Sequence, residues 1–518
     1  MPTQDLGPSS PGRTTDGPLG SPQLWIVAFG VFVAADDLMV VATMLRPIID
    51  DLGLIVPDDL DATAWIVNAY LIAYIAAIPL AGKLSDIVGR RAVFVSSLVL
   101  FAIGSLIVPS TDSFGVLLFG RALSAVGGGA LVPVALAVAG DLHTGAQRTR
   151  ALGLLGAIET MGWVWGPMYG ALLVRFLTWQ WQFYLNVPLA VAGIVVGWRV
   201  LDPTKRSGRR IDWWGAALLT VGLVALNVAL LGQAKIQSVS GLEELTGSSS
   251  SWWSGPWLYL VAVVAFAAFV VVERRNAVVG DIDPVVSPTV LGSRATVSAM
   301  AVNGLVGVGL VIALVNVPLF INIAENQSGI GSTALLAGIL LTALTATMAV
   351  TSYLGGEMAA RLGNRTPIVA GVSLAIVGFA VMGFTWDADT PHLLMAMELA
   401  VIGAGIGLVL APTNAAVVDA AAEDERGGAA GLVIVFRLIG FSVGLAGLTA
   451  WGLHRYGQLR NELELPALGE PGYETALADA AVDITTTALA ETFAGSAIVL
   501  GVALVIALAV RPDEGAVG

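Results

Sequence analysis

Residues Gly82–Arg91 read GKLSDIVGRR, and residues Gly356–Arg365 read GEMAARLGNR. The two stretches match at three positions with one constant separation of 274 residues: Gly82 with Gly356, Gly89 with Gly363, and Arg91 with Arg365. Each stretch follows the second long apolar run of a set of six. The repeat therefore predicts two related halves, each built from six apolar segments.

The apolar runs around these stretches are long enough to cross a membrane. Of the 518 residues, 56% are hydrophobic and only 12% are charged, whereas a soluble protein has roughly a quarter charged residues. A spanning helix needs about 20 mostly apolar residues. Fourteen runs meet this length, near residues 24–48, 62–84, 91–109, 113–140, 150–176, 182–201, 213–233, 256–273, 297–324, 333–356, 366–386, 391–420, 427–455 and 488–510. We expect an all-α membrane protein with fourteen transmembrane helices.

The repeat and the runs divide the chain into bundles, a linker and two tails. The first six runs predict an N-terminal bundle over residues 22–201, and the last six predict a C-terminal bundle over residues 297–511. Residues 202–296 join the bundles through two extra spans, and residues 1–21 and 512–518 are tails. The first tail is rich in Pro, Gly, Ser and Thr, which predicts disorder. Parallel six-helix halves are typical of carriers whose substrate site lies between two rocking bundles.

The positions of the basic residues predict the orientation in the membrane. Most of the 25 Lys and Arg residues fall in the tails and in the loops on the side of the N-terminus, as at Lys83, Arg90 and Arg91. The opposite loops are acidic, as at Asp50 and Asp51. Because loops rich in Lys and Arg stay in the cytoplasm, we expect an integral inner (plasma) membrane protein with both termini cytoplasmic.

Several chemical classes are excluded by residues that the chain lacks. There is no cysteine, so disulfides and thiolate metal sites are absent. A net charge of −13 argues against nucleic acid as a partner. Neither a phosphate-binding GxxxxGK[ST] loop nor an HExxH metal motif is present. We therefore expect no enzyme activity, no cofactor and no metal.

The two repeated stretches are predicted to control conformational change. Their glycines allow helix ends to approach closely, while their arginines are expected to stay in water and to pair with an acid across the loop. Asp86 is the candidate acid in the first stretch, and Ala360 replaces it in the second. The gating assignment comprises Gly82, Asp86, Gly89, Arg90, Arg91, Gly356, Gly363 and Arg365. The alternative is that Arg90 and Arg91 only anchor the topology.

Acids within the spans are candidate functional residues, because a charged side chain at the bilayer centre costs at least about 2.5 kcal/mol. Span 1 contains Asp36 and Asp37, and span 5 contains Glu159. We assign proton coupling to these three acids. Neighbouring helical residues differ by about 100° in direction, so Asp36 and Asp37 are expected to face different surroundings.

Small residues accompany Glu159 on its helix and predict close contact with another helix. This small-residue stripe comprises Gly162, Gly166, Pro167 and Gly170. It should make the face of Glu159 an interior one.

Four further ionisable residues are expected to be charge partners within the membrane, namely Arg437, Arg121, Glu398 and Arg426. An arginine beside an acid favours the charged form of that acid and loses this influence when the conformation changes. The sequence does not determine which pairs are in contact. A static polar network that only holds the bundle together stays open as an alternative.

Several of these motifs resemble those of the major facilitator superfamily. GKLSDIVGRR resembles its loop signature, and Arg121 with the three glycines that follow resembles its basic motif in span 4. The sequences MGWVWGPMYG and WQWQFYLNVP, together with fourteen spans, resemble its drug:proton antiporter branch. That branch has an acid before a proline-bearing end of span 1. Here Asp37 lies nine residues before Arg46, with Pro47 next, although Met39 stands where the branch has Thr. The resemblance implies a major facilitator fold, with two six-helix bundles plus two inserted linker helices, and a stripe typical of exporters.

Residues 456–487 are largely polar and mix helix formers with a break between Pro466 and Gly472. We expect the last two helices to continue by about 10 residues each, or roughly 15 Å, into the external space. A disordered acidic loop is the alternative. The extension, the span 1 and span 5 acids, and a span 13 that runs from Arg426 to Arg437 are similar to those of the mycobacterial triacylglyceride exporters.

These resemblances imply a secondary active transporter that exports lipophilic or amphiphilic molecules by alternating access. It is expected to be coupled to protons and to act as a monomer among membrane lipids. Two substrate classes stay open, namely drugs in multidrug efflux and lipids in a dedicated triacylglyceride exporter. A lipid exporter would have a periplasmic lipid-carrying lipoprotein as a candidate partner. A non-transporting membrane receptor is a remote alternative.

Overall fold

The computed structural model describes residues 20–53, 60–203, 210–233, 257–279, 282–285, 292–324, 330–463 and 473–509. Within these ranges the chain forms fourteen long helices and one pair of two-residue strands. The predicted tails lie outside the described residues except for residues 20 and 21, and so does the predicted break between Pro466 and Gly472.

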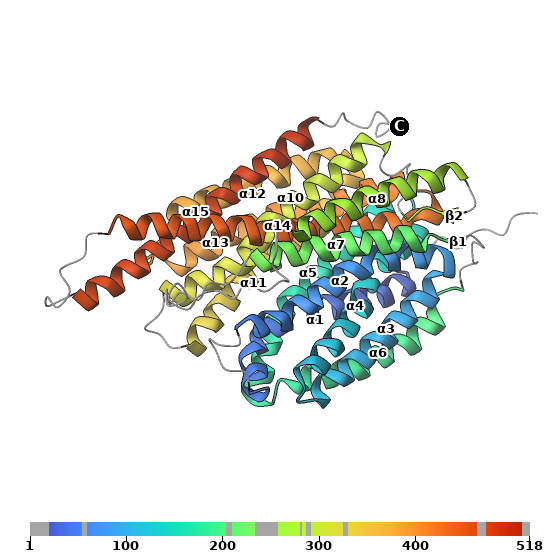
Figure 1. The fold of residues 1–518 in the computed structure, drawn as a ribbon. Coiled ribbons are helices and arrows are strands. Elements are labelled where there is room, and N and C mark those ends of the chain that lie inside the picture. Colours follow the sequence, from blue (N-terminus) through green and yellow to red (C-terminus); the bar gives the residue numbers. More distant parts are fainter. Residues whose placement is uncertain are drawn as a thin grey trace, which may run out of the picture.

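The first six helices form one half of the molecule, coloured blue to cyan in Figure 1. They are α1 (Pro22–Asp51), α2 (Leu60–Val88), α3 (Arg90–Ile107), α4 (Phe114–Leu142), α5 (Gly145–Phe176) and α6 (Gln180–Val200), with a 3-10 turn η2 (Val108–Ser110) before α4. Helix α4 lies at the centre and packs against α1, α2 and α3. Glycines make these contacts close, since a Cβ on Gly129 would lie 2.6 Å from the carbonyl oxygen of Tyr74 in α2.

The last six helices form the second half, coloured yellow to red in Figure 1. They are α10 (Arg294–Ala324), α11 (Ile330–Leu362), α12 (Arg365–Thr385), α13 (His392–Ala420), α14 (Arg426–Asn461) and α15 (Tyr473–Ala509), with a 3-10 turn η4 (Glu423–Glu425) before α14. The packing repeats that of the first half. The contacts of α11 with α13, α10 with α14, and α12 with α15 correspond to those of α2 with α4, α1 with α5, and α3 with α6.

The repeated stretches form equivalent turns in the two halves. Gly89 separates α2 from α3 with φ at 110°, and Gly363 follows α11 with φ at 79°. A residue with a Cβ rarely adopts such positive φ values, and no non-glycine among the described residues does so. We call the end of the molecule that carries these two turns the motif end.

The halves meet through α2 against α14 and through α5 against α11. At the motif end a Cβ on Gly82 of α2 would overlap the backbone carbonyl of Gly427 in α14. A Cβ on Gly153 of α5 would lie 3.3 Å from the Cα of Gly356 in α11. The small residues at these four positions are therefore what lets the two halves touch at this end.

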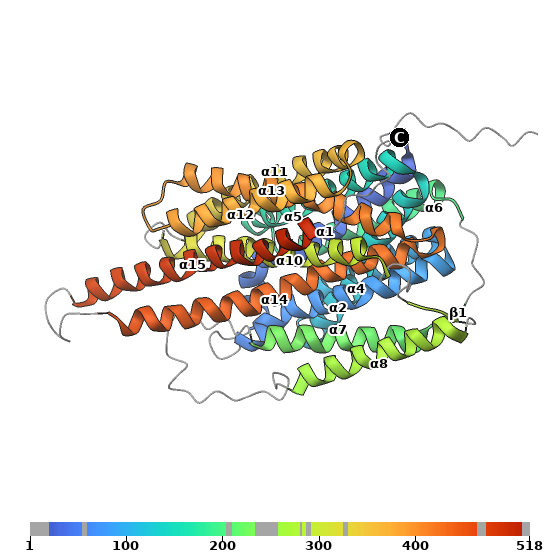
Figure 2. The same ribbon diagram turned by 90° about the horizontal axis from the view of Figure 1, so that it is seen from above.

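Two helices of the linker lie beside the junction between the halves. They are α7 (Trp213–Gln233) and α8 (Trp257–Val279), and they are preceded and followed by the parallel strands β1 (Arg210–Ile211) and β2 (Ile282–Asp283). Figure 2 shows α7 alongside α2 and α14, with α8 outside it. Asn227 of α7 is buried and hydrogen-bonds to Ser442 of α14. Helix α7 thus contacts both halves.

Thirteen helices in the described part of the chain are long and apolar enough to cross a membrane. Helix α5 is not among them, and it carries four charged side chains, Arg148, Arg150, Glu159 and Arg175. It nevertheless runs for 32 residues and packs between α1 and α11. The predicted all-α membrane fold with fourteen long helices is therefore confirmed, with α5 packed against α1 on one side and α11 on the other.

Helices α14 and α15 are the longest in the structure, with 36 and 37 residues. At about 1.5 Å per residue they are each roughly 55 Å long, against about 30 Å for the hydrocarbon core of a bilayer. Both helices extend beyond their neighbours at the end opposite β1 and β2 (Figures 1 and 2). They include residues 456–461 and 473–487 of the predicted extension. Its position outside the membrane stays a prediction.

Candidate functional site

The two acids of α1 lie where α5 approaches α1 most closely. A Cβ on Gly166 of α5 would lie 2.8 Å from the carbonyl oxygen of Asp36, and one on Gly162 would lie 3.0 Å from its backbone nitrogen. Gly170 is buried on the same helix. Pro167 belongs to α5, but its side chain is outside the described part of the structure. The small-residue stripe therefore holds α5 against the acid pair.

Asp37 forms a buried ion pair within the first half. Its Oδ2 accepts a hydrogen bond from Nη1 of Arg121 in α4 at 3.1 Å, and both side chains are at most 2% exposed. The Arg121 guanidinium also lies 4.1 Å from the centre of the Tyr70 ring, a cation–π contact. A fully buried charge needs such partners, because an unpaired one is too costly to bury.

Two amides of α6 complete the surroundings of the acids. Asn186 Nδ2 donates to Oδ1 of Asp37 at 2.9 Å, and Gln182 Nε2 donates to Oδ2 of Asp36 at 3.0 Å. The two adjacent acids thus have different hydrogen-bond partners, but both face α6. Of these two acids, only Asp37 forms an ion pair with another described residue.

Glu159 forms a second buried ion pair, and this one joins the two halves. Its Oε1 lies 2.5 Å from Nη2 of Arg437 in α14, and the side chains are 7% and 2% exposed. Trp163, one turn further along α5, lies under the Arg437 guanidinium at 5.4 Å and against the edge of Phe441. Glu159 and Trp163 therefore face the opposite half, whereas the neighbouring glycines face α1.

Glu398 has neutral partners instead of a cation. Its two carboxylate oxygens accept hydrogen bonds from Thr385 Oγ1 at 2.8 Å and from Trp386 Nε1 at 2.7 Å. Trp386 packs in turn between the rings of Phe320 and Phe493. Glu398 therefore joins helices within the second half, and the charge partner expected from the sequence is absent among the described residues.

The first repeated stretch attaches α2 to the other half at the motif end. Asp86 accepts hydrogen bonds from the backbone N–H groups of Gly427 at 2.9 Å and Gly428 at 3.0 Å, and it pairs with Arg90. A helix N-terminus carries a partial positive charge, so Asp86 binds the start of α14 by charge as well as by hydrogen bonds. Arg90 is only 6% exposed. The expectation that it stays in water is therefore wrong, because three polar side chains enclose it.

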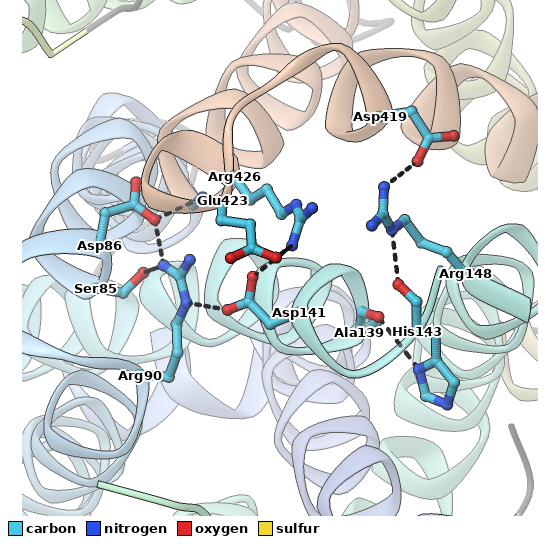
Figure 3. A network of polar contacts seen from close by, with 11 residues as sticks. Ser85, Asp86, Arg90, Ala139, Asp141, His143, Arg148, Asp419, Glu423 and Arg426 are labelled. Atoms are coloured by element: carbon cyan, nitrogen blue, oxygen red, sulfur yellow. Dashed lines mark hydrogen bonds and ion pairs between the residues drawn. The ribbon is translucent and has the colours of Figure 1, made fainter. Parts of the chain in front are cut away.

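Asp141, at the end of α4, connects Arg90 of the first half with Arg426 of the second half (Figure 3). It accepts hydrogen bonds from Arg90 Nε at 3.0 Å and from Arg426 Nη1 at 3.1 Å. Arg426 is the first residue of α14. It belongs to the motif end and is not a charge partner of the acids of α1 or α5.

A further ion pair between the halves lies beside this network (Figure 3). Arg148 of α5 donates to Oδ1 of Asp419 in α13 at 2.5 Å, and its Nε donates to the carbonyl oxygen of His143 at 2.9 Å. Burial lowers the pKa of His143 below its ordinary value of 6.5, and the nearby Arg148 lowers it further. His143 is therefore neutral at pH 7.

The second repeated stretch makes different contacts from the first. Glu357, next to Gly356, pairs with Arg150 of α5 across the halves, with Nη2 to Oε1 at 2.9 Å. Arg365 donates to the carbonyl oxygen of Leu508 at 2.8 Å, within its own half. The expected asymmetry of the two stretches is thus present in their contacts. In the second stretch Glu357, four residues before Arg361, supplies the negative charge that Ala360 lacks.

Arg91 takes no part in these networks. Its guanidinium lies 4.7 Å from the ring centre of Trp198 in α6. This contact lies within the first half and fits the alternative that Arg91 anchors the helix end.

Sequence reasoning did not assign several residues to these networks, among them Gln182, Asn186, Asp141, Arg148, Glu357 and Asp419. Gln182 and Asn186 are four residues apart at the start of an apolar helix, which places them on one face, and that spacing was the available signal. The charged residues of this group lie in or next to polar loops, where charged residues are common. No group of three or more His, Asp or Glu side chains that could hold a metal occurs among the described residues.

Comparison with known proteins agrees with the architecture. A model of the Major Facilitator Superfamily matches residues 27–445 and, in a second alignment, residues 315–516. The solved structure of the human organic anion transporter MFSD10 superposes with a TM-score of 0.58 at 15% identity, covering 94% of this chain and 99% of that one. At that identity the match concerns the fold alone.

Relatives with established names are also similar over most of their length. A triacylglyceride transporter of Mycolicibacterium smegmatis is 32% identical over 469 residues, which cover 87% of this chain and 79% of the relative. The multidrug transporter protein MdtP of Bacillus subtilis is 29% identical over 441 residues, which cover 85% and 76%. Together with the paired six-helix halves and the family match, these relatives establish that this chain is a membrane transporter of the Major Facilitator Superfamily and not an enzyme.

Proposed function

We propose that this transporter exports lipophilic or amphiphilic molecules across the inner membrane by alternating access, in exchange for protons. The ion pair between Glu159 and Arg437 is the observation that carries the proposal. It is buried, it contains a carboxylate that a proton can neutralise, and it joins the two halves that must separate.

Protonation of Glu159 would weaken the contact between the halves. Breaking a buried ion pair by removing one partner costs about 3–5 kcal/mol, and adding a proton to the carboxylate removes most of the same attraction. The bound proton would therefore favour a conformation in which α5 and α14 have moved apart. Asp37 and Arg121 form a second acid–base pair inside the first half, so their contact can persist while the halves move.

The contacts at the motif end fit a conformation closed on the cytoplasmic side. Asp86, Asp141, Arg148 and Glu357 all bind residues of the opposite half at this end. The distribution of Lys and Arg predicts that the motif end is cytoplasmic. Release of a proton inward would then require these contacts to open, as alternating access demands.

Proton-driven uptake of a lipophilic cationic dye into inverted membrane vesicles tests this proposal. We expect uptake by the wild type to require an inward-acidic gradient and to be lost in Glu159→Gln, because a side chain that cannot exchange a proton cannot couple the gradient to the contact with Arg437. Asp50→Asn, on the exposed last turn of α1, is the control and should transport normally. Uptake that ignores the gradient would contradict proton coupling, and gradient-driven uptake that survives Glu159→Gln but is lost in Asp37→Asn would assign coupling to Asp37.

Export of a lipid is the second candidate function. The length of α14 and α15 favours it, because helices that continue outside the bilayer could guide a hydrophobic substrate away from the outer leaflet or contact a periplasmic lipid-carrying lipoprotein. The relatives named triacylglyceride transporters support the same reading. Extraction of a labelled triacylglyceride from proteoliposomes, with no uptake of the dye, would favour lipid export over multidrug efflux.

The transporter is expected to act as a monomer in either case.

A further inference from the structure

The side chains of Asp36 and Gln182 leave two buried oxygens without a hydrogen-bond donor. The Gln182 amide donates to Oδ2 of Asp36. Gln182 is 1% exposed and Asp36 is 7% exposed. Among the described residues, Oδ1 of Asp36 and Oε1 of Gln182 are buried and have no partner. A carboxylate oxygen and an amide oxygen are both acceptors. If Asp36 were ionised, neither could satisfy the other.

The neighbouring acid, Asp37, is the one whose negative charge is balanced by a cation. Asp37 accepts from Asn186 and pairs with Arg121, so both of its oxygens have donors. Among the described residues, the titratable groups that face Asp36 are Asp37 on its own helix and Tyr169 on α5, and neither is a cation. A second ionised carboxylate at this position would be repelled by Asp37 and would be buried without a counter-charge.

We propose that Asp36 is a neutral carboxylic acid in this conformation and forms a cyclic pair with the amide of Gln182. The Gln182 N–H donates to the carbonyl oxygen of Asp36, and the Asp36 O–H donates to the carbonyl oxygen of Gln182. One proton from water forms the O–H bond, and the same proton returns to water when the pair opens. This arrangement satisfies both of the oxygens that otherwise have no donor. Gln182 acts as a positioning residue, because it binds the protonated acid on two sides.

The pair is connected to the junction between the halves through α5. A Cβ on Gly166 would lie 3.4 Å from Oδ1 of Asp36, so the backbone of α5 covers the oxygen that bears the proton. The same helix carries Glu159, which pairs with the opposite half. Uncovering Asp36 would require α5 to shift against α1 within the first half, in addition to the separation of Glu159 from Arg437. Within the proposed antiport cycle, on which this last step rests, Asp36 is the acid loaded with a proton while the motif end is closed.

Infrared difference spectroscopy of the purified protein tests the protonation state directly. We expect the spectrum of the wild type minus that of Asp36→Asn at pH 7 to contain the C=O stretch of a protonated carboxylic acid. Asp36→Asn keeps a cyclic pair, of amide with amide, so the fold should survive. Asp50→Asn, an exposed acid of the same helix, should leave the band in place. In Gln182→Leu the band should move to higher frequency, since the carbonyl of Asp36 loses its donor.

Two results would overturn the inference. These are the absence of a carboxylic acid band from the spectrum of the wild type minus that of Asp36→Asn, and a band whose frequency Gln182→Leu does not change. The outcome is independent of the transport assay. Gradient-driven dye uptake without an Asp36 band would keep the proposed function and reject this inference. A band that behaves as expected, in a protein without gradient-driven transport, would support the inference and reject the proposed coupling.

Discussion

The residues of the two acid–base pairs differ in what they connect. Asp37 and Arg121 both belong to the first half, whereas Glu159 and Arg437 belong to different halves and are 278 residues apart in the chain. Only the second pair can therefore change when the halves move as rigid bodies. Under the proposed mechanism, Glu159 and Arg437 would therefore separate when the halves move, whereas Asp37 and Arg121 would stay in contact.

Substitutions at the pair between the halves should show strong coupling. Glu159→Gln and Arg437→Gln should each lower the free energy of unfolding by about 3–5 kcal/mol, because each leaves one buried charge alone. The double variant should recover much of the loss, since no uncompensated charge remains. Thermal unfolding of all four proteins in detergent gives the coupling free energy.

The control for this cycle is the pair of Arg455 and Glu491, which is about 30% exposed on each side. Glu491→Gln should cost no more than about 1 kcal/mol, as for partly solvated ion pairs. Equal losses for Glu159→Gln and Glu491→Gln would contradict the view that burial between the halves gives the first pair its strength.

At the residue scale, the sequence identified charges but not contacts. Asp37 and Glu159 stand out because ionisable residues are rare in apolar runs, whatever the fold. Their partners lie 84 and 278 residues away, and only the packing of the helices brings them together. Gln182 and Asn186 were missed because a neutral amide near a helix start is unremarkable until it faces a buried acid. The functional roles of all these residues stay predictions.

At the scale of the helices, close contact at the motif end depends on α2 and α14 having no side chain where they touch. Gly427→Ala should disrupt this contact, because its Cβ would overlap the backbone of α2 at Gly82 and lie 2.7 Å from Oγ of Ser85. We expect the population with an open motif end to increase several-fold. Gly447→Ala on the same helix is the control, since a Cβ there has nothing within 4 Å.

Spin labels can measure this population. The chain has no cysteine, so Leu142→Cys in α4 and Ala422→Cys before α14 introduce two labelling sites, both exposed. Longer distances between the labels in Gly427→Ala than in Gly447→Ala would support the prediction. Identical distance distributions in the two variants would show that the contact does not limit opening.

Apolar runs locate the helices but do not give their full length. The expected span near 366–386 corresponds closely to α12, because that helix ends where its apolar run ends. The apolar runs near 427–455 and 488–510 are shorter than α14 and α15 by several residues or more, and the expected continuation of these two helices came from their polar helix-forming residues instead. Hydropathy marks only the part of a helix that contacts lipid or a buried core. The polar turns beyond that part follow from helix propensity and from packing between α14 and α15.

At the scale of the whole molecule, the linker helices are attached to the junction between the halves. Asn227 of α7 is 1% exposed and binds Ser442 of α14, and α7 also packs against α2. Asn227→Leu and Ser442→Ala should be coupled by about 0.6–1.7 kcal/mol, the range for hydrogen bonds between membrane helices. A double-mutant cycle by thermal unfolding measures this, with Asn227→Leu and the exposed Val443→Ala as the uncoupled control. Additive effects of Asn227→Leu and Ser442→Ala would mean that α7 is held by apolar packing alone.

Helix α14 runs without interruption from the motif end to the far tip of the molecule. Asp86 and Asp141 hold its first turn, and Glu159 holds it at Arg437, near the middle of the bundle. From Arg437 to Asn461 it continues for about 36 Å as a single rod. Because the rod is continuous, a rotation of about 10° at the level of Arg437 would displace the tip by about 6 Å. Under the proposed proton coupling, loss of the contact between Glu159 and Arg437 would therefore be transmitted along α14 to the far tip of the molecule.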